Sequence, residues 1–165
     1  MDQCTKKNSR NKLLDNQTVG TIYGENTVGS MKTILTDPVI LSNIRSDVNC
    51  KILDVGLGSG CVVFQSAQLF GFGGLLFNHV ECAGIELIEN RLGNSLINHN
   101  SLVQKSILSV NCKIAFACCD ACNLESLDPF TIVYFFHKGL TDVQFGKFLE
   151  VLNNRYVCLC YYDII

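Results

Sequence analysis

The sequence lacks the features that mark disordered, fibrous and repetitive chains. Proline occurs only twice in 165 residues, charged residues make up 17% of the chain, and hydrophobic residues make up 48%. These values exclude disorder over most of the length, and they exclude collagen-like and mucin-like repeats. A length of 165 residues suits one compact domain and excludes a large two-domain enzyme.

Long apolar runs are also absent. No stretch of 18 or more uninterrupted apolar residues occurs, and the first residues, MDQCTKKNSRNKLLDN, contain no apolar segment of the kind found in signal peptides. We therefore expect neither a spanning helix nor a secretory leader. The sequence predicts an intracellular protein, cytoplasmic or nuclear, without a membrane partner.

Cysteine, in contrast, is abundant, at ten residues. Because intracellular thiols stay reduced, we interpret most of these cysteines as small core side chains and not as a disulfide framework. Cys118, Cys119 and Cys122 form the one cluster. A structural zinc site needs four ligands, and the sequence offers no second C-x-x-C and no paired histidines, so we predict no metal site.

Charge is unevenly distributed along the chain. The first 12 residues carry four basic side chains against one acidic side chain. We interpret residues 1–20 as a polar basic tail without fixed structure, and residues 21–165 as a single domain. The alternative is a basic arm that contacts nucleic acid or an acidic protein surface. No aromatic residue interleaves the basic ones, so nucleic acid is not expected as a specific partner.

Beyond the tail, short apolar runs alternate with longer segments of helical spacing, which is the pattern of a parallel sheet covered on both faces. Five of the runs are rich in β-branched or aromatic residues and are expected to be strands: 51–55, 80–86, 113–118, 130–136 and 156–162. With right-handed crossovers, the expected fold is α/β, a Rossmann-like open parallel sheet in the order 3-2-1-4-5.

Helices are expected between these strands. The longest, over 89–110, is expected to bury one apolar stripe made of Leu92, Leu96, Val103, Ile107 and Val110. His99 lies on that stripe, and we interpret it as a packed, hydrogen-bonded histidine in preference to a catalytic one.

Two helix starts carry their own signals. Thr141 and Gln144 have the spacing of a capping box and precede a segment with apolar residues on one face. Asp37 before Pro38 marks a second start, because proline is favoured at the first position of a helix.

The segment KILDVGLGSGCVVFQSA carries the most information about function. An expected strand ends in Asp54 and runs into Gly56, Gly58 and Gly60, giving the motif D-x-G-x-G-x-G. Glycines allow a turn that a Cβ would forbid, and they let an anionic ligand reach free N–H groups at a helix start. Cys61 stands where a dinucleotide fingerprint or a P-loop would need another residue. A tight turn without a ligand is the structural alternative.

Two further acids follow the next two expected strands. Glu86 ends the second strand, where a carboxylate can accept hydrogen bonds from both hydroxyls of a ribose. Asp120 follows the third strand and can accept a hydrogen bond from the exocyclic amine of a base. Together with Asp54, these acids predict a nucleoside site at the carboxyl ends of three adjacent strands.

The run DVGLGSG, followed by Glu86 and Asp120, resembles the class I S-adenosylmethionine-dependent methyltransferases. More narrowly, Tyr23-Gly24-Glu25 and the run GSGCVVFQSA resemble the non-SET, disruptor-of-telomeric-silencing type of histone lysine methyltransferase. The resemblance implies a seven-strand sheet, S-adenosylmethionine as cofactor, and a histone or another protein as acceptor. It also implies that the donor, or its product S-adenosylhomocysteine, contacts Tyr23, Glu25, Asp54, Gly56, Gly58, Gly60, Cys61, Glu86, Leu87, Asp120 and Ala121.

The acceptor side departs from that family. Tyr134, Phe135, Phe136 and His137 stand where the family carries an Asn-Asn-Phe-like segment. We expect Phe135, Phe136 and His137 to line a dry acceptor mouth that depresses the pKa of an amine, with strand-end packing as an equal alternative. Because the sequence stops soon after the fifth expected strand, we expect strands 6 and 7 to be missing. We therefore also expect donor binding with poor methyl transfer.

Two other functions stay open. A non-catalytic domain that binds S-adenosylmethionine or a protein partner would show binding without turnover. An NAD-binding oxidoreductase fits the acid after the second strand, but it does not fit the glycine spacing.

Overall fold

The computed structural model describes residues 27–43, 50–71, 80–108, 112–136, 140–152 and 158–160. The expected tail, 1–20, lies outside these residues. The helices are α2 (Val28–Leu35), α3 (Pro38–Asn43), α4 (Cys61–Gly71), α5 (Glu89–Gln104), the short 3-10 helix η1 (Ala121–Asn123) and α6 (Asp142–Leu152). The strands are β1 (Cys50–Val55), β2 (Val80–Glu86), β3 (Cys112–Cys118), β4 (Ile132–Phe135) and β5 (Cys158–Cys160).

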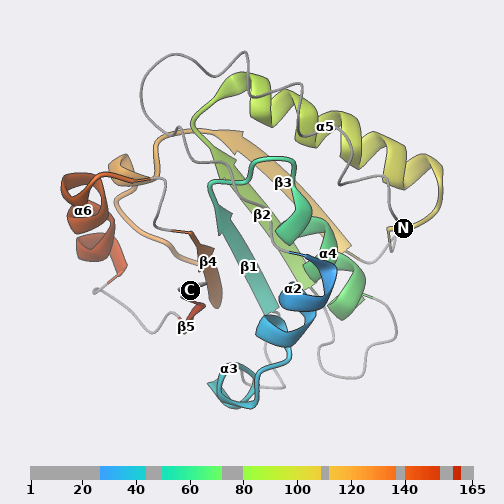
Figure 1. Ribbon diagram of the computed structural model, residues 1–165, viewed down its shortest axis with the longest axis horizontal. Coiled ribbons are helices and arrows are strands. Elements are labelled where there is room, and N and C mark those ends of the chain that lie inside the picture. Colours follow the sequence, from blue (N-terminus) through green and yellow to red (C-terminus); the bar gives the residue numbers. More distant parts are fainter. Residues whose placement is uncertain are drawn as a thin grey trace.

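All five strands belong to one parallel sheet with the order β3-β2-β1-β4-β5, which confirms the expected order (Figure 1). The central strand β1 pairs with β2 on one side and with β4 on the other, so that Ile52 lies between Cys82 and Ile132. The fourth strand is shorter than expected, because Phe130 belongs to a turn in which its N–H donates to the carbonyl of Leu127 at 2.9 Å.

A hydrophobic core lies on each face of the sheet. On one face, Ile52 and Cys82 pack with Met31 of α2 and Val63 of α4, all 2% exposed or less. On the other face, Leu53 and Val133 pack with Phe148 of α6. Figure 1 shows α4 lying across β1 to β3 and α6 beside β4. Neighbouring residues of β1 thus serve different cores, as the alternation of a strand requires.

Coverage of both faces was expected for the whole sheet, and this is wrong at the edge strand β3. Its residues Lys113, Ala115 and Ala117 are exposed, whereas Ile114 and Phe116 on the other face are half-buried against the first core. A charged residue and two alanines on the exposed face limit the apolar area that β3 presents to water.

The expected stripe of α5 is also wrong in part. Leu96 and Val103 are 46% and 52% exposed, the helix ends at Gln104 before Ile107, and Val110 lies outside the described residues. The face turned to the sheet carries Leu92, Ser95, His99 and Leu102 instead. The buried residue that follows Leu92 is Ser95, at i+3, and not Leu96, at i+4. The sequence-based prediction chose Leu96 because it is apolar and serine is not.

The packing interpretation of His99 agrees with its surroundings. Its ring stacks on Phe64 of α4 with centroids 6.2 Å apart, and it meets Phe116 of β3 edge-on at 5.8 Å. The histidine therefore joins α5 to α4 and β3 beneath the sheet edge.

Both expected helix starts are confirmed. The N–H of Thr141 donates to Oε1 of Gln144 at 3.0 Å, and the N–H of Gln144 donates to Oγ1 of Thr141 at 3.3 Å, which is a capping box. At α3, Oδ1 of Asp37 accepts from the N–H of Val39 at 2.8 Å. In the part of the chain that the structure describes, no helix has both the length and the apolar character to cross a bilayer.

Candidate functional site

The turn from β1 to α4 adopts a conformation that requires its glycines. Gly56, Gly58 and Gly60 have φ angles of 85°, 56° and 88°. This left-handed region costs other residues about 1–2 kcal/mol each. At Gly60 there is a second reason, since an added Cβ would lie 2.5 Å from Cε2 of Phe64. The turn therefore needs its glycines to adopt this backbone conformation, and the same glycines leave its backbone uncovered by side chains of their own.

The glycine turn is fastened to the end of β2. The N–H groups of Gly56 and Leu57 donate to the carbonyl of Ile85 at 3.0 and 2.9 Å. The side chain of Leu57 fills the space where a Cβ on Gly84 would stand. Sequence reasoning did not assign Gly84 a role, although a glycine inside a strand is a signal of close approach by another segment.

Glu86 connects the tips of β1 and β2. Its Oε2 accepts from the N–H of Gly58 at 2.9 Å, and its Oε1 accepts from the N–H of Ile88 at 3.0 Å. The residue is only 5% exposed. An ionised carboxylate has about four acceptor sites, so each oxygen of Glu86 retains capacity for another donor. Two oxygens in a fixed orientation suit a ligand with two neighbouring hydroxyl groups.

Asp54 lies on the same face of the sheet, one strand away. It is 2% exposed, and its Oδ2 is buried without a hydrogen-bond partner. Burial, and to a smaller extent the nearby charge of Glu86, together raise the pKa of this carboxyl from 3.8 to about 8. Buried carboxyl oxygens are normally hydrogen-bonded, so an unpaired one at this edge indicates a missing donor.

The tip of β3 brings Asp120 to the same edge. The N–H of Cys119 donates to the carbonyl of Glu86 at 3.1 Å, which holds the ends of β3 and β2 together. Asp120 follows directly, and its Oδ1 accepts from the N–H of Cys122 at 2.9 Å at the start of η1. Ala121 packs against the second core. The three acids of the sequence prediction therefore stand at the carboxyl ends of β1, β2 and β3.

Two residues of α5, which the sequence-based prediction missed, donate hydrogen bonds to backbone carbonyls of the glycine turn. Oγ of Ser95 donates to the carbonyl of Gly58 at 2.7 Å, and Nδ2 of Asn98 donates to the carbonyl of Ser59 at 3.0 Å. Ser95 is fully buried. Spacing along the chain gives no signal for them, because the apolar Leu96 stands next to Ser95 and is the residue that the periodicity favours as buried.

Cys61 and Leu87 flank the turn and the second strand tip. Cys61 is the first residue of α4, half-buried, and its Sγ accepts from the hydroxyl of Ser59 at 3.4 Å. Leu87 is 49% exposed directly after Glu86. An exposed leucine at this place offers an apolar surface to the flat face of a base.

The expected acceptor residues are placed differently from one another. Phe135 is 4% exposed and packs on Phe145 and Phe148 of α6, with ring centroids 6.1 and 4.5 Å away. It is part of the second core, in keeping with the packing alternative. Phe136 is half-buried and packs against the first core. His137 lies outside the described residues, as do Tyr23 and Glu25.

Cys118 and Cys122, two of the three clustered cysteines, contact different backbone carbonyls. Sγ of Cys118 lies 3.7 Å from the carbonyl of Leu87, and Sγ of Cys122 lies 3.4 Å from the carbonyl of Gln144. Across the described ranges, no group of three or more His, Cys, Asp and Glu side chains has an arrangement that could hold a metal ion.

Comparisons by sequence and by structure give different results. No family model and no curated protein matches the sequence. Solved structures match the fold, among them an S-adenosylmethionine-dependent methyltransferase from Methanosarcina mazei, with a TM-score of 0.51 and 19% identity over 73% of this chain and 52% of that one.

Two further solved structures match to a similar degree. YjhP from E. coli has a TM-score of 0.53 and 17% identity, and the match covers 80% of this chain and 46% of that one. Magnesium protoporphyrin IX methyltransferase (ChlM) from Synechocystis PCC 6803, solved with bound S-adenosylhomocysteine, has a TM-score of 0.51 and 15% identity over 80% and 58%. The chain thus has the open-sheet fold of class I methyltransferases and spans about half the length of these three proteins.

Proposed function

We propose that the chain binds S-adenosylmethionine at the carboxyl edge of β1, β2 and β3 and transfers its methyl group to an acceptor. The observation that carries the proposal is the unpaired, buried Oδ2 of Asp54 beside a glycine turn whose Gly58 amide is held by Glu86. The fold supports it, because ligands of open α/β sheets bind outside the carboxyl ends of the strands. Similar folds hold S-adenosylhomocysteine in the structures of ChlM and of the plantazolicin methyltransferase BamL.

The residues present fit this donor group by group. The donor carries an ammonium group that can pair with Oδ2 of Asp54, and its ribose hydroxyls can donate to the two oxygens of Glu86. Asp120 suits the exocyclic amine of the adenine, and the exposed Leu87 suits its flat face. The glycine turn brings the backbone of Gly56 close to the ligand without an intervening side chain.

The remaining donor contacts rest on the resemblance alone. Tyr23 and Glu25 belong to the Tyr-Gly-Glu segment, and we place that segment against the donor because the resembling family uses it so. Gly60, Cys61 and Ala121 complete the proposed set, the first two through the turn and the helix start and the third beside Asp120.

When bound, S-adenosylmethionine supplies an electrophilic methyl group on a sulfonium, and transfer is a direct displacement by the acceptor. Such a displacement needs alignment of the reacting atoms, which can lower the barrier by up to about 7–11 kcal/mol. The protein's task is therefore to bind, orient and exclude water. The rigid hydrogen bonds of Glu86, Ser95 and Asn98 to the glycine turn serve the orienting part of that task.

For the acceptor, we propose a lysine side chain of a histone or another protein. The support is the resemblance of Tyr23 to Glu25 and of Asp54 to Ala67 to the non-SET histone lysine methyltransferases. Structures of similar fold are named for very different acceptors, a glycopeptide and a porphyrin among them. Phe136 and His137 are the residues we propose at the acceptor mouth, next in sequence to Phe135, which belongs to the second core.

Calorimetric titration with S-adenosylhomocysteine, S-adenosylmethionine and NAD tests the donor site. We expect saturable binding of the first two ligands and none of NAD. The variant Glu86→Gln should bind weakly, whereas the matched control Glu81→Gln, at the other end of the same strand, should bind like the unchanged chain. NAD binding that persists in excess S-adenosylhomocysteine would support an oxidoreductase and overturn the proposal.

Transfer itself needs a separate measurement. The chain is incubated with core histones and S-adenosylmethionine that carries a labelled methyl group, and the label on lysine is followed by mass spectrometry. Labelled lysine supports the enzyme. Saturable donor binding without any label on histones, other proteins or small amines would favour the non-catalytic binding domain.

A further inference from the structure

Three thiols lie at the amino ends of β1, β2 and β3, at the opposite end of the sheet from the proposed donor site. Cys50 begins β1, Cys112 begins β3, and Cys82 is near the start of β2. The register pairs Cys50 with Val80 and Val80 with Cys112, and Cys82 is two residues beyond Val80. Residues paired across parallel strands, and residues two apart on one strand, share a face, so all three thiols point to the first core.

Two of the three sulfurs are in contact. Sγ of Cys82 and Sγ of Cys112 are 3.9 Å apart, whereas Sγ of Cys50 lies 3.9 Å from the hydroxyl of Thr131 on the opposite side of β1. A disulfide needs about 2.05 Å between its sulfurs, so the two sulfurs have to approach by a further ~2 Å or less. Because Cys82 lies two residues beyond the partner of Cys112 in the register, closing the bond also requires a small backbone shift at Cys112, the first residue of the edge strand β3. The geometry therefore pairs Cys82 with Cys112 and leaves Cys50 with a different partner.

The two contacting thiols differ in access. Cys82 is 2% exposed and belongs to the first core, whereas Cys112 is half-buried at the sheet edge. A reagent from solution therefore reaches Cys112 first. Cys82 can react only with a group that is already attached to Cys112.

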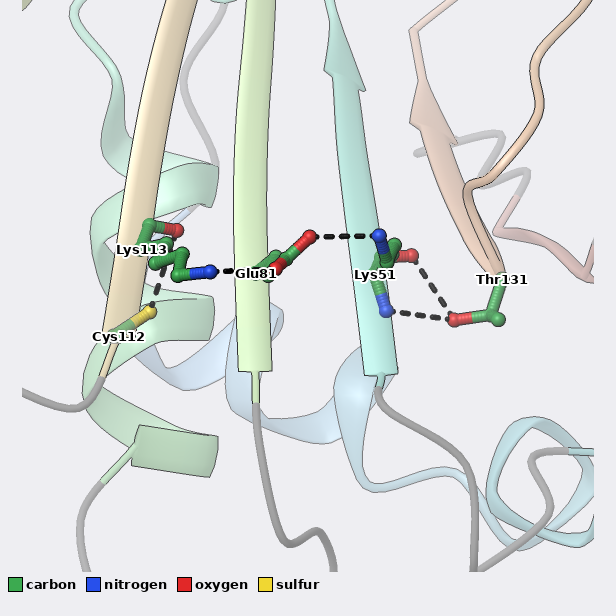
Figure 2. Close-up of polar contacts among 5 residues, drawn as sticks. All are labelled: Lys51, Glu81, Cys112, Lys113 and Thr131. Atoms are coloured by element: carbon green, nitrogen blue, oxygen red, sulfur yellow. Dashed lines mark hydrogen bonds and ion pairs between the residues drawn. The ribbon is translucent and has the colours of Figure 1, made fainter.

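A row of ion pairs crosses β1, β2 and β3 on the other face of the sheet, beside the amino ends of these strands. Nζ of Lys51 lies 2.8 Å from Oε2 of Glu81, and Nζ of Lys113 lies 3.4 Å from Oε1 of the same carboxylate. Figure 2 shows these side chains in line across the three strands, with Cys112 next to Lys113. Because Glu81 precedes Cys82 and Lys113 follows Cys112, the row lies on the face opposite to the two thiols, and the backbone ladder between β2 and β3 sets their offset.

We propose that Cys112 and Cys82 form a thiol modification site, in which Cys112 reacts with a small disulfide of the glutathione class and Cys82 then resolves the adduct. In the first step, the Cys112 thiolate attacks one sulfur of oxidised glutathione and releases one glutathione thiolate. In the second step, the Cys82 thiolate attacks Sγ of Cys112 and releases the second glutathione. Two protein thiols are oxidised to one disulfide, and one oxidised glutathione is reduced to two thiols.

The acidities of the two thiols favour this order. The hydrogen bond between the two sulfurs lowers the pKa of Cys112, against the opposing effect of burial. The same hydrogen bond, together with burial, raises the pKa of Cys82 well above its usual range. Burial raises the pKa of Cys50 to about 11. Since the thiolate is the nucleophile, Cys112 is the one of the three that is prepared to attack.

The test uses the full chain, oxidised glutathione, alkylation of remaining thiols under acidic denaturing conditions, and tryptic mapping by mass spectrometry. Cleavage after Lys51, Arg91, Lys105 and Lys113 gives fragment 106–113, whose one cysteine is Cys112, and fragment 52–91, which contains Cys61 and Cys82. We expect fragment 106–113 joined to fragment 52–91 in the unchanged chain. The variant Cys82→Ser should instead carry a stable glutathione on fragment 106–113, and Cys112→Ser should leave Cys82 as a free thiol.

The matched control is Cys50→Ser, which removes a buried thiol of the same face from the neighbouring strand and should map like the unchanged chain. A stable glutathione on Cys112 in the unchanged chain would overturn the proposal, because it would show that Cys82 does not resolve the adduct. A link between the two fragments that survives Cys82→Ser would also overturn it. The map of the unchanged chain decides the pairing even where a variant fails to fold, and it does not depend on donor binding.

Discussion

Ser95 on α5 donates a 2.7 Å hydrogen bond to the carbonyl oxygen of Gly58, and Glu86 on β2 accepts a 2.9 Å hydrogen bond from the N–H of the same glycine. The central residue of the glycine turn is thus held at both of its backbone polar groups by two different elements. Asn98 adds a third hydrogen bond, which it donates to the carbonyl of Ser59. A backbone surface that is fixed before the ligand arrives loses less conformational entropy on binding.

This arrangement predicts a difference between two asparagines of α5. Asn98→Ala removes the hydrogen bond to Ser59 and should weaken S-adenosylhomocysteine binding by about 0.5–1.5 kcal/mol, the usual net worth of one hydrogen bond. Asn94→Ala, at an exposed position one turn earlier in the same helix, should leave the affinity unchanged. Calorimetric titration of both variants makes the comparison. Equal losses would show that the effect comes from the helix and not from the turn.

Ser95→Ala should act more strongly on stability, because it leaves a buried carbonyl of Gly58 unpaired. We expect a loss of about 1–3 kcal/mol in the free energy of unfolding, measured by urea denaturation. A fall in stability below 0.5 kcal/mol, on the scale of ordinary surface substitutions, would contradict this account.

Glu86 should contribute to donor affinity more than any other single side chain of the edge. Glu86→Ala removes a carboxylate that can accept both ribose hydroxyls, and S-adenosylmethionine binding should weaken by about 1.5–3 kcal/mol, the usual worth of hydrogen bonds to a charged group. Glu81→Ala on the same strand is the matched control, because it removes a carboxylate at the other end of β2. Unchanged affinity in Glu86→Ala would remove Glu86 from the site.

Much of this edge could be predicted from the sequence, because a parallel sheet places strand ends together. Asp54, Glu86 and Asp120 are far apart in the chain, yet each follows a recognisable strand, and right-handed crossovers bring the strand tips to one edge. The glycine turn could also be predicted, because three glycines in one short segment indicate backbone conformations that other residues avoid. All three glycines have left-handed φ angles.

The support behind the glycine turn could not be predicted in the same way. Periodicity favours Leu96 as the buried residue of α5. In the structure Ser95 is buried instead, where its hydroxyl donates to the carbonyl of Gly58. The pairing of Cys82 with Cys112 depends on a two-residue offset between strands, and register is a tertiary property that spacing along the chain does not reveal.

The glycine turn makes its own prediction. Gly56→Ala should lower the free energy of unfolding by about 1–2 kcal/mol through the left-handed φ alone, since nothing lies within 4 Å of the added Cβ. Gly60→Ala should cost more, about 2–5 kcal/mol, because its Cβ also meets the ring of Phe64. Gly146→Ala, in the exposed middle of α6, should raise stability by about 0.5–1 kcal/mol. Urea denaturation measures all three, and equal effects at Gly56 and Gly60 would argue against the contact with Phe64.

The buried carboxyl of Asp54 predicts how stability changes with pH. Its pKa is raised to about 8 in the folded chain, against an ordinary value near 4 in the unfolded chain. Between these two values the folded chain binds the proton more tightly, so the contribution of Asp54 is full below about pH 4 and is lost as the pH rises through about 8. The urea midpoint of the unchanged chain should therefore fall over this window relative to that of Asp54→Asn. Parallel midpoint curves for the two chains would contradict the raised pKa.

Donor binding should reverse the ionisation of Asp54, and this links the acid to the proposed site. An ammonium group placed at Oδ2 favours the carboxylate, so its arrival has to expel the proton that burial keeps on Asp54 at pH 6.5. Titration of S-adenosylhomocysteine in two buffers of different ionisation enthalpy should then show release of up to one proton per ligand bound. In Asp54→Asn the carboxamide has no such proton, so binding should be weaker and its heat should not depend on the buffer. Proton release that is the same in both chains would mean that the ligand's ammonium does not meet Asp54, and the orientation of the donor along the strand tips would have to be reversed.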